Sequence, residues 1–106
     1  MGSENLNIIV TFRHIESTEA LKSHTINKVS HVLNKYNVKD GVEASVTLTV
    51  EKRHQTAEVR VKSIGFELTA KATNDDLYSA IDEMATSLEV QIRKQKDKQV
   101  TAKYHQ

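Results

Sequence analysis

The chain is 106 residues long, a length typical of one small domain rather than two. Hydrophobic residues make up 38% of it and charged residues 27%, a composition that excludes a collagen-like chain and argues against full disorder. Fifteen Lys and Arg residues oppose fourteen Asp and Glu residues, so the formal net charge is +1. This small sum counts against a nucleic-acid partner only if the charges are evenly spread, because phosphate binding depends on local cationic surface.

The chain contains no cysteine, which excludes disulfide bonds, a thiolate nucleophile and a cysteine zinc site. No segment reaches the roughly 18 to 20 apolar residues of a membrane helix, and the N-terminus lacks the layout of a signal peptide. We therefore predict a cytoplasmic protein without a membrane partner. Residues 1–3 are interpreted as a cloning remnant, 4–98 as a single domain and 99–106 as a flexible C-terminal tail.

The first two elements are a strand and a helix. Apolar and polar residues alternate over Leu6–Phe12, which predicts the strand. Ser17 or Thr18 can cap the helix that follows, in which apolar residues recur at helical spacing over Leu21–Tyr36. The polar segment Asn37–Gly41 then ends the helix in a turn.

Three further strands are predicted, because apolar and polar residues alternate over 42–51, 57–62 and 66–72. The loop at 52–56 and the tight turn at 63–65 that connect them are both short. Strands joined by such short links pair antiparallel, so we expect a three-stranded meander.

A second helix follows the meander. Thr73 or Asn74 can cap it, with Asp75 and Asp76 in its first turn, and its apolar stripe covers Leu77–Ile92. The order β-α-β-β-β-α predicts an α+β two-layer sandwich, in which a four-stranded sheet carries both helices on its apolar face. The opposite face of the sheet is polar and can remain in contact with solvent.

The charges are unevenly distributed along the chain. Residues 93–106 hold five basic residues and one acidic residue, a net charge of +4. Residues 1–92 hold ten basic and thirteen acidic residues, a net charge of −3. The small total therefore results from a basic C-terminal end that offsets a mildly acidic body, and clustered cations bind phosphates whatever the total charge is.

The first helix carries a second basic group. Its members recur at intervals of three and four residues and so share one side of the helix: they are His24, Lys28, His31 and Lys35. This stripe is turned roughly 120° from the centre of the apolar face, so we expect it to face solvent. Exposed lysines are most often merely solvated, and composition alone favours that plainer interpretation.

No motif for catalysis or metal binding occurs in the sequence. The five histidines form no HExxH pattern, and there is no glycine-rich phosphate loop or nucleophile elbow. Asp75 and Asp76 are better explained as charges at a helix N-terminus than as a catalytic pair. We therefore expect a protein that is not an enzyme and that uses no metal, cofactor or small-molecule substrate.

Four segments carry a family pattern: TEALKSHTINKVSHVLNKY at 18–36, VTLTVEK at 46–52, NDDLYSAIDEM at 74–84 and QIRKQKDK at 91–98. Together they resemble the ribosome hibernation promoting factor family, which includes protein Y, the ribosome-associated inhibitor. The resemblance covers Leu6–Lys98, and its most specific parts are LYSAID and RKQKDK. It implies the short form of the family and the same β-α-β-β-β-α fold, which is similar to double-stranded RNA-binding domains.

This resemblance implies a ribosome-binding protein. Family members bind the small ribosomal subunit and its rRNA in the mRNA and tRNA channel, which blocks translation in stationary phase or stress. The short form also promotes inactive ribosome dimers together with ribosome modulation factor. The rRNA-contacting positions of the family correspond to Lys22, Lys28, His31, Arg93, Lys94, Lys96 and Lys98. Two positions depart from the family pattern, since His31 stands where Lys or Arg is usual and Val90 stands where Arg is common.

Two other functions stay open at this point. A general double-stranded RNA-binding module would share the fold and the basic surface, and it would read the shape of a duplex. A protein-interaction domain without an RNA function would leave the lysines solvated. Tight binding to a plain RNA duplex would favour the module, and binding that barely responds to salt would favour the interaction domain.

Overall fold

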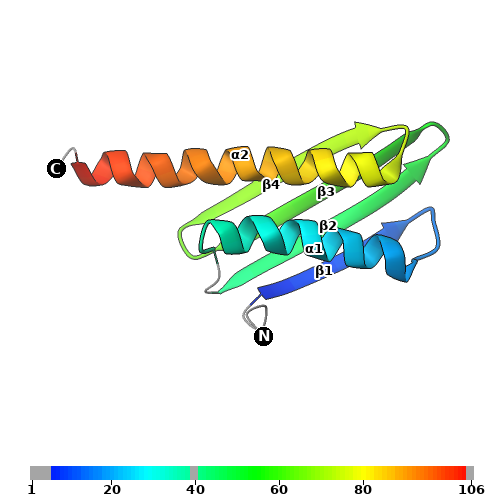
Figure 1. Ribbon diagram of the computed structural model, residues 1–106, viewed down its shortest axis with the longest axis horizontal. Helices are drawn as coiled ribbons and strands as arrows, with labels where there is room; N and C mark the ends of the chain where they lie inside the picture. The colour runs from blue at the N-terminus through cyan, green and yellow to red at the C-terminus, as the bar shows by residue number, and fades with distance from the viewer. Residues whose placement is uncertain (1–5, 39–40, 105–106) are drawn as a thin grey trace.

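The computed structural model describes residues 6–38 and 41–104, with side chains over 7–38 and 41–96. Its elements follow the predicted order β-α-β-β-β-α (Figure 1). They are β1 (Leu6–Arg13), α1 (Glu19–Lys35), β2 (Val42–Glu51), β3 (His54–Ser63), β4 (Phe66–Asn74) and α2 (Leu77–Tyr104).

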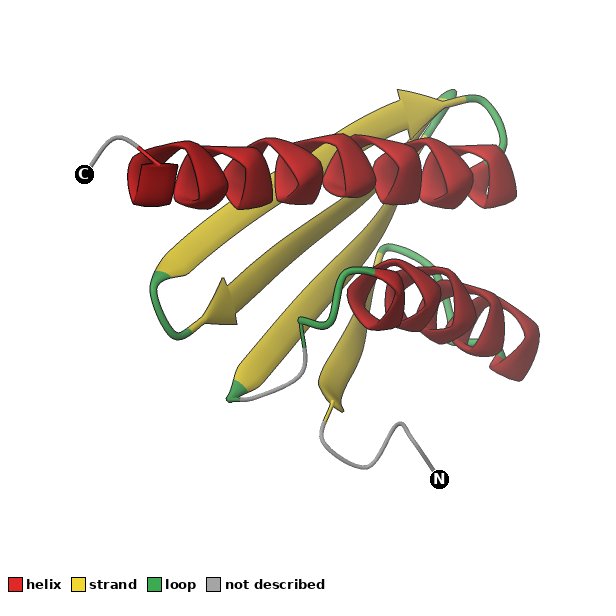
Figure 2. Cartoon of the chain, turned by 60° about the vertical axis from the view of Figure 1, so that its left-hand side comes forward, coloured by secondary structure: helices red, strands yellow, loops and turns green. Residues whose placement is uncertain are grey.

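The strands form one sheet in the order β1-β2-β3-β4. The pairs β2–β3 and β3–β4 are antiparallel, which confirms the predicted meander. β1 pairs with β2 in parallel, and α1 makes the crossover that such a pair requires. Both helices cover the same face of the sheet, α2 over β3 and β4 and α1 on the side of β1, as Figures 1 and 2 show. The predicted two-layer α+β sandwich is therefore confirmed.

The hydrophobic core fills the space between the sheet and the helices. Helix-facing residues in the middle of β2 and β3 are buried, because alternate side chains of a strand point to the same face, and those of β1 and most of β4 are partly buried. Val46 of β2 and Val59 of β3 meet Leu33 of α1 and Ile81 and Leu88 of α2, and each of these side chains is at most 1% exposed. The apolar stripes of both helices thus pack on the apolar face of the sheet, as their spacing predicts.

Helix α1 begins and ends with local capping interactions. The Thr18 hydroxyl accepts a hydrogen bond from the backbone N–H of Leu21 at 3.1 Å, so Thr18 rather than Ser17 is the cap. At the other end, Asn37 adopts a left-handed φ of 58°, a conformation that asparagine tolerates better than most residues. The helix therefore stops at the polar segment where the sequence predicts that it should.

The connection between β2 and β3 is shorter than predicted. β3 begins at His54, which pairs with Glu51, so only Lys52 and Arg53 form the turn. The predicted loop at 52–56 is wrong, because polar composition does not distinguish a loop from a strand that has one face in solvent. On a sheet with one solvated face, polar residues such as Gln55 continue the ladder of hydrogen bonds.

The start of α2 also differs from the prediction. β4 continues to Asn74, and the cap is Asp76, whose carboxylate accepts hydrogen bonds from the Ser79 backbone N–H at 3.0 Å and hydroxyl at 2.9 Å. Asp75 and Asp76 therefore precede the helix instead of lying in its first turn, and neither Thr73 nor Asn74 caps it. Thr73 and Asn74 remain in β4, because both residues pair with β3.

Helix α2 is the longest element, with 28 residues, and its distal part extends beyond the sheet (Figure 1). The apolar stripe ends at Ile92, but the backbone is helical as far as Tyr104. Part of the segment 99–106, predicted to be a flexible tail, is thus helical in backbone, and its flexibility stays a prediction. None of the described helices is long and apolar enough to cross a membrane.

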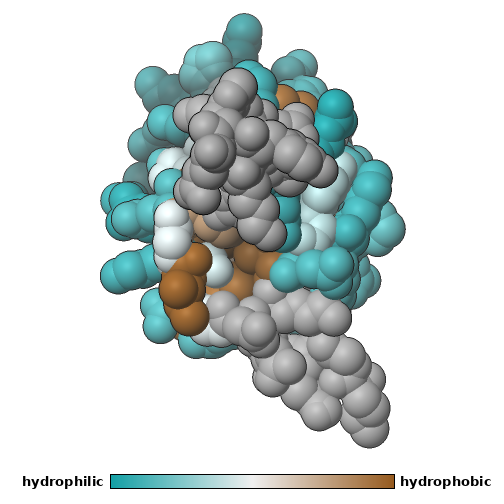
Figure 3. Space-filling view, turned by 90° about the vertical axis from the view of Figure 1, so that its left-hand side faces the viewer, coloured by the Kyte–Doolittle hydropathy of each residue, from teal (hydrophilic) through white to brown (hydrophobic). Residues whose placement is uncertain are grey.

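An apolar side chain is exposed at the end of the molecule toward which α2 points. Figure 3 shows this end, where brown surface gathers among hydrophilic side chains. Ile64, in the turn between β3 and β4, is 82% exposed and lies beside Gly41, which has a left-handed φ of 63°. Single exposed apolar residues are ordinary on soluble proteins, so Ile64 by itself does not indicate a binding site.

Candidate nucleic-acid interface

The two helices present one common outer surface. They lie beside each other on the sheet and run in the same direction (Figure 1). Polar contacts join them at two levels: His24 and Lys28 meet Asp82, and Lys35 meets Glu89. Predicted basic residues therefore share one face of the molecule if they lie on the outer sides of α1 and α2 or on the sides that face each other.

The basic group on α2 is open to solvent. Arg93 and Lys94 are exposed, and Lys96 is half-buried. Among the described side chains, no carboxylate lies within ion-pair distance of these three cations. Lys98 belongs to the same helix, but its side chain lies outside the described residues. This distal basic segment, Arg93 to Lys98, thus presents exposed cations to an anionic ligand at Arg93 and Lys94.

The residues predicted on α1 do not all lie together. Lys22, Lys28 and His31 are each exposed. Lys22 precedes Lys28 by six positions, which turns it by about 120° around the helix axis. Lys28 and His31 share the side of α1 that approaches α2, and Lys22 points elsewhere. One ligand surface can therefore include Lys28 and His31 with Arg93, whereas Lys22 would need a separate contact.

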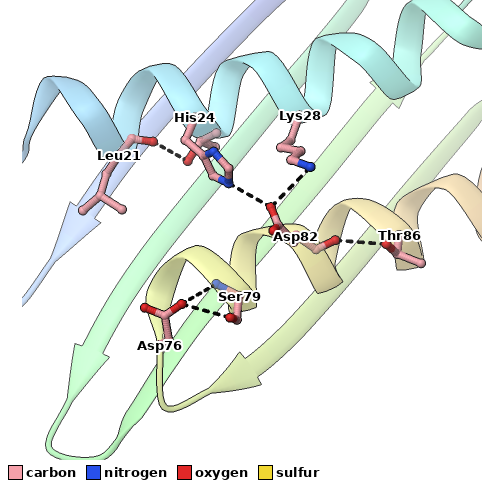
Figure 4. Close-up of polar contacts among 8 residues, drawn as sticks. Leu21, His24, Lys28, Asp76, Ser79, Asp82 and Thr86 are labelled. Carbon is pink, nitrogen blue, oxygen red and sulfur yellow. Dashed lines mark hydrogen bonds and ion pairs between the residues drawn. The ribbon is translucent and has the colours of Figure 1, made fainter.

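The basic stripe on α1 is less free than predicted. The ring Nε2 of His24 lies 2.8 Å from Asp82 Oδ1, and Lys28 Nζ lies 3.6 Å from the same oxygen (Figure 4). The His24 ring also packs edge-on against Tyr78, with 5.0 Å between ring centroids. His24 is consequently half-buried, and the prediction that the whole stripe faces solvent was wrong. The reason is lateral packing, since this side of α1 meets the neighbouring helix.

A second interhelical contact lies two turns further along. Lys35 Nζ donates to Glu89 Oε2 at 2.7 Å, and the Tyr36 hydroxyl donates to the same oxygen at 2.9 Å. The hydrogen bond to Glu89 raises the pKa of Lys35. The hydrogen bonds from Lys35 and then Tyr36 lower the pKa of Glu89. Both charges of this pair are therefore kept over a wide pH range.

Asp82 and Glu89 were missed as partners of α1, although the sequence held a signal. Lys28 and Lys35 are seven residues apart, and so are Asp82 and Glu89. Seven residues make nearly two helical turns, so each pair recurs on one side of its helix. When two parallel helices carry opposite charges at the same interval, each cation of one helix is expected to lie beside a carboxylate of the other.

The Glu89 contact makes a prediction about stability and pH. A carboxylate whose pKa is lowered by folding stabilises the folded state above its unfolded pKa, and this contribution is lost as pH falls through the folded pKa. Glu89→Gln should therefore lower the melting temperature slightly at pH 7, and the difference from wild type should shrink toward pH 3. Thermal melts at both pH values test this. A difference that stays constant down to pH 3 would contradict a role for the Glu89 charge.

Comparison with known proteins decides the family. The model of the family described as "Sigma 54 modulation protein / S30EA ribosomal protein" matches residues 8–100. The chain belongs to this family. Its relatives include a ribosome hibernation promoting factor of Pseudomonas putida, 31% identical over 94 residues that cover 89% of this chain and 90% of the relative. The factor of Escherichia coli is 31% identical over 93 residues, covering 88% and 96% of the two chains. The family resemblance predicted from the sequence is thus confirmed.

Two solved structures share this fold. A ribosomal subunit interface protein from Coxiella burnetii has a TM-score of 0.76 at 22% identity, covering 86% of this chain and 98% of its own. The N-terminal domain of Protein Y from Thermus thermophilus has a TM-score of 0.73 at 28% identity, with coverages of 83% and 97%. The first likeness shows the fold alone, and both agree with the two-layer architecture described above.

One residue expected to depart from the family pattern lies on the surface. Val90 is 39% exposed on α2. It lies between Glu89, which contacts α1, and the distal basic segment. This apolar residue adds no charge to the surface of α2 and does not fill the core. Among the described residues, no cluster of three or more His, Asp or Glu side chains is suited to hold a metal ion.

Proposed function

We propose that this protein is a ribosome hibernation factor that binds the small ribosomal subunit and its rRNA in the mRNA and tRNA channel. The observation that carries the proposal is the exposure of Arg93 and Lys94 on α2, in a chain of the hibernation factor family. Cations placed in this way bind phosphates and fix position without reading bases. The proposed contacts are Arg93, Lys94, Lys96 and Lys98, with Lys28, His31 and Lys22 as further contacts on α1.

The proposed mechanism is steric. The sheet and the two packed helices form a compact body, and the distal part of α2 extends beyond it (Figure 1). Held by phosphate contacts along α2, this body would occupy the space that tRNA and mRNA need, so translation would stop in stationary phase or stress. The proposal extends to inactive ribosome dimers, formed together with ribosome modulation factor, because the related proteins are named as promoters of hibernation.

Sedimentation of ribosomes on sucrose gradients tests this function. The protein should sediment with the small subunit and with whole ribosomes but not with the large subunit, and ribosome modulation factor should shift ribosomes into dimers. Binding should weaken steeply between 50 and 200 mM salt, because phosphate contacts release counterions. Protein that stays at the top of the gradient would contradict the proposal. Tight binding to a plain RNA duplex of 20 base pairs in the absence of ribosomes would favour the double-stranded RNA-binding module.

A further inference from the structure

Among the described side chains of α2, two carboxylates lie against cations of α1, namely Asp82 and Glu89. We propose that they restrict which RNA the protein binds, because they hold the α1 cations in internal ion pairs that a phosphate backbone must replace. A backbone would then bind the helices tightly only where it also reaches the distal basic segment. The inference rests on the proposed function in one respect, namely that the ligand is RNA.

The Asp82 contact is close and also open to solvent. Its Oδ1 atom lies 2.8 Å from Nε2 of His24 and 3.6 Å from Nζ of Lys28 (Figure 4). The side chains of Lys28 and Asp82 are 46% and 48% exposed. An RNA phosphate could therefore approach Lys28, but it would meet the negative charge of Asp82 at the same place.

Glu89 stands between the α1 contacts and the distal basic segment. Its side chain, 27% exposed, is bonded to Lys35 and Tyr36 on one side. Arg93 follows one turn later on α2, close enough for its charge to contribute to the lowered pKa of Glu89. A phosphate bound by Arg93 would thus have Lys35 nearby, but Lys35 is already engaged by Glu89.

Neutralising Asp82 or Glu89 is expected to change RNA binding more than the stability of the fold. Exposed ion pairs contribute little to the stability of a fold, so removing Asp82 or Glu89 should leave the protein folded. Two unit charges about 4 Å apart in a water-like medium interact with an energy that corresponds to about a fivefold change in affinity. Neutralising either acid should therefore tighten binding to unrelated RNA by roughly that factor.

The structure supplies a matched control. Asp82→Asn and Glu89→Gln each remove one negative charge from α2, and Glu83→Gln does the same at the position next to Asp82. Glu83 accepts a hydrogen bond from the Asn74 side chain at 2.8 Å and forms no ion pair with a described cation of α1. All three variants have the same net charge, so a difference between them reports the release of α1 cations.

The measurement is fluorescence anisotropy with two labelled probes, an oligouridine of 20 nucleotides and a plain RNA duplex of 20 base pairs, at 30 and 100 mM KCl. Asp82→Asn and Glu89→Gln should each bind these probes about fivefold more tightly than wild type, and Glu83→Gln less than twofold. Equal affinities for all three variants, or no gain over wild type, would overturn the inference. Thermal melts of each variant verify that the fold is kept.

Double variants identify the cation responsible. Lys28→Gln should cancel the gain made by Asp82→Asn, and Lys35→Gln should cancel the gain made by Glu89→Gln, because each partner carries the released charge. A gain that survives the loss of its partner would overturn the mechanism. Ribosome sedimentation is measured separately: its failure would sink the proposed function, whereas unchanged affinity for the plain probes would sink only this inference.

Discussion

Changing Arg93, Lys94 and Lys96 together to Glu is expected to abolish sedimentation of the protein with ribosomes at 150 mM monovalent salt. Each phosphate contact contributes about a fivefold gain in affinity at this salt through counterion release, so three contacts account for about a hundredfold. The reversed charges add repulsion, which makes a hundredfold loss the lower limit. All three side chains lie outside the core, and the fold should therefore be kept.

A matched pair of neutral variants separates the position of the charge from its amount. In one protein Arg93, Lys94 and Lys96 become Gln, and in the other three of the exposed cations on the open sheet face become Gln, namely Arg60, Lys62 and Lys71. Both proteins lose three positive charges. Only the helix variant should lose ribosome binding. If both lose it equally, net charge rather than the surface of α2 controls the interaction, and if neither does, the basic-helix proposal fails.

The largest effect on folding is expected from Leu88→Ala. Leu88 is fully buried where α2 packs on the sheet, so its loss removes apolar contact and leaves a cavity. Substitutions of this kind cost about 3 to 5 kcal/mol. A small domain has a total stability of roughly 5 to 15 kcal/mol, so this variant should be close to its folding limit at 37 °C. Urea unfolding followed by circular dichroism gives the free energy of unfolding.

Val90→Ala is the control for this prediction. Val90 lies on the same helix two residues further on, but it is 39% exposed and contributes little to the core. Its substitution should change the free energy of unfolding by less than about 0.5 kcal/mol. If Leu88→Ala and Val90→Ala unfold at the same urea concentration, α2 is not docked on the sheet as described.

Periodic patterns predicted the strands and helices more reliably than local composition predicted where they end. The strand pattern of Val42–Glu51 and the helix pattern of Leu21–Tyr36 were reliable, because burial of one face repeats at the period of the element. Element ends were less reliable. Gln55 extends a strand although it is polar, and Asp76 caps α2 although two earlier residues suit the role equally well. Capping preference is a local energy of about 1 kcal/mol, which strand pairing outweighs.

The residues of the candidate site also differ in how far the sequence predicts their surroundings. The exposure of Arg93 and Lys94 follows from their distance around α2 from the apolar stripe, so the sequence could predict it. The engagement of Lys28 by Asp82 could not be predicted with the same certainty, since it depends on how two distant segments lie beside each other. A helical wheel gives the angle of a side chain but not the identity of the neighbour it meets.

The sequence by itself determined the order of the elements, the residues of the core and the basic end of α2, because these depend on periodicity and on local clustering of charge, and its motifs carried the family resemblance. Only the tertiary structure decided the parallel pairing of β1 with β2 and the lateral contact of the two helices. That contact changes the interpretation of the net charge. The total of +1 includes α1 cations held by α2 carboxylates, because packing on one sheet face brings the opposite stripes within 4 Å of each other. The charge excess of the C-terminal end, residues 93–106, is +4 and lies beyond these two contacts.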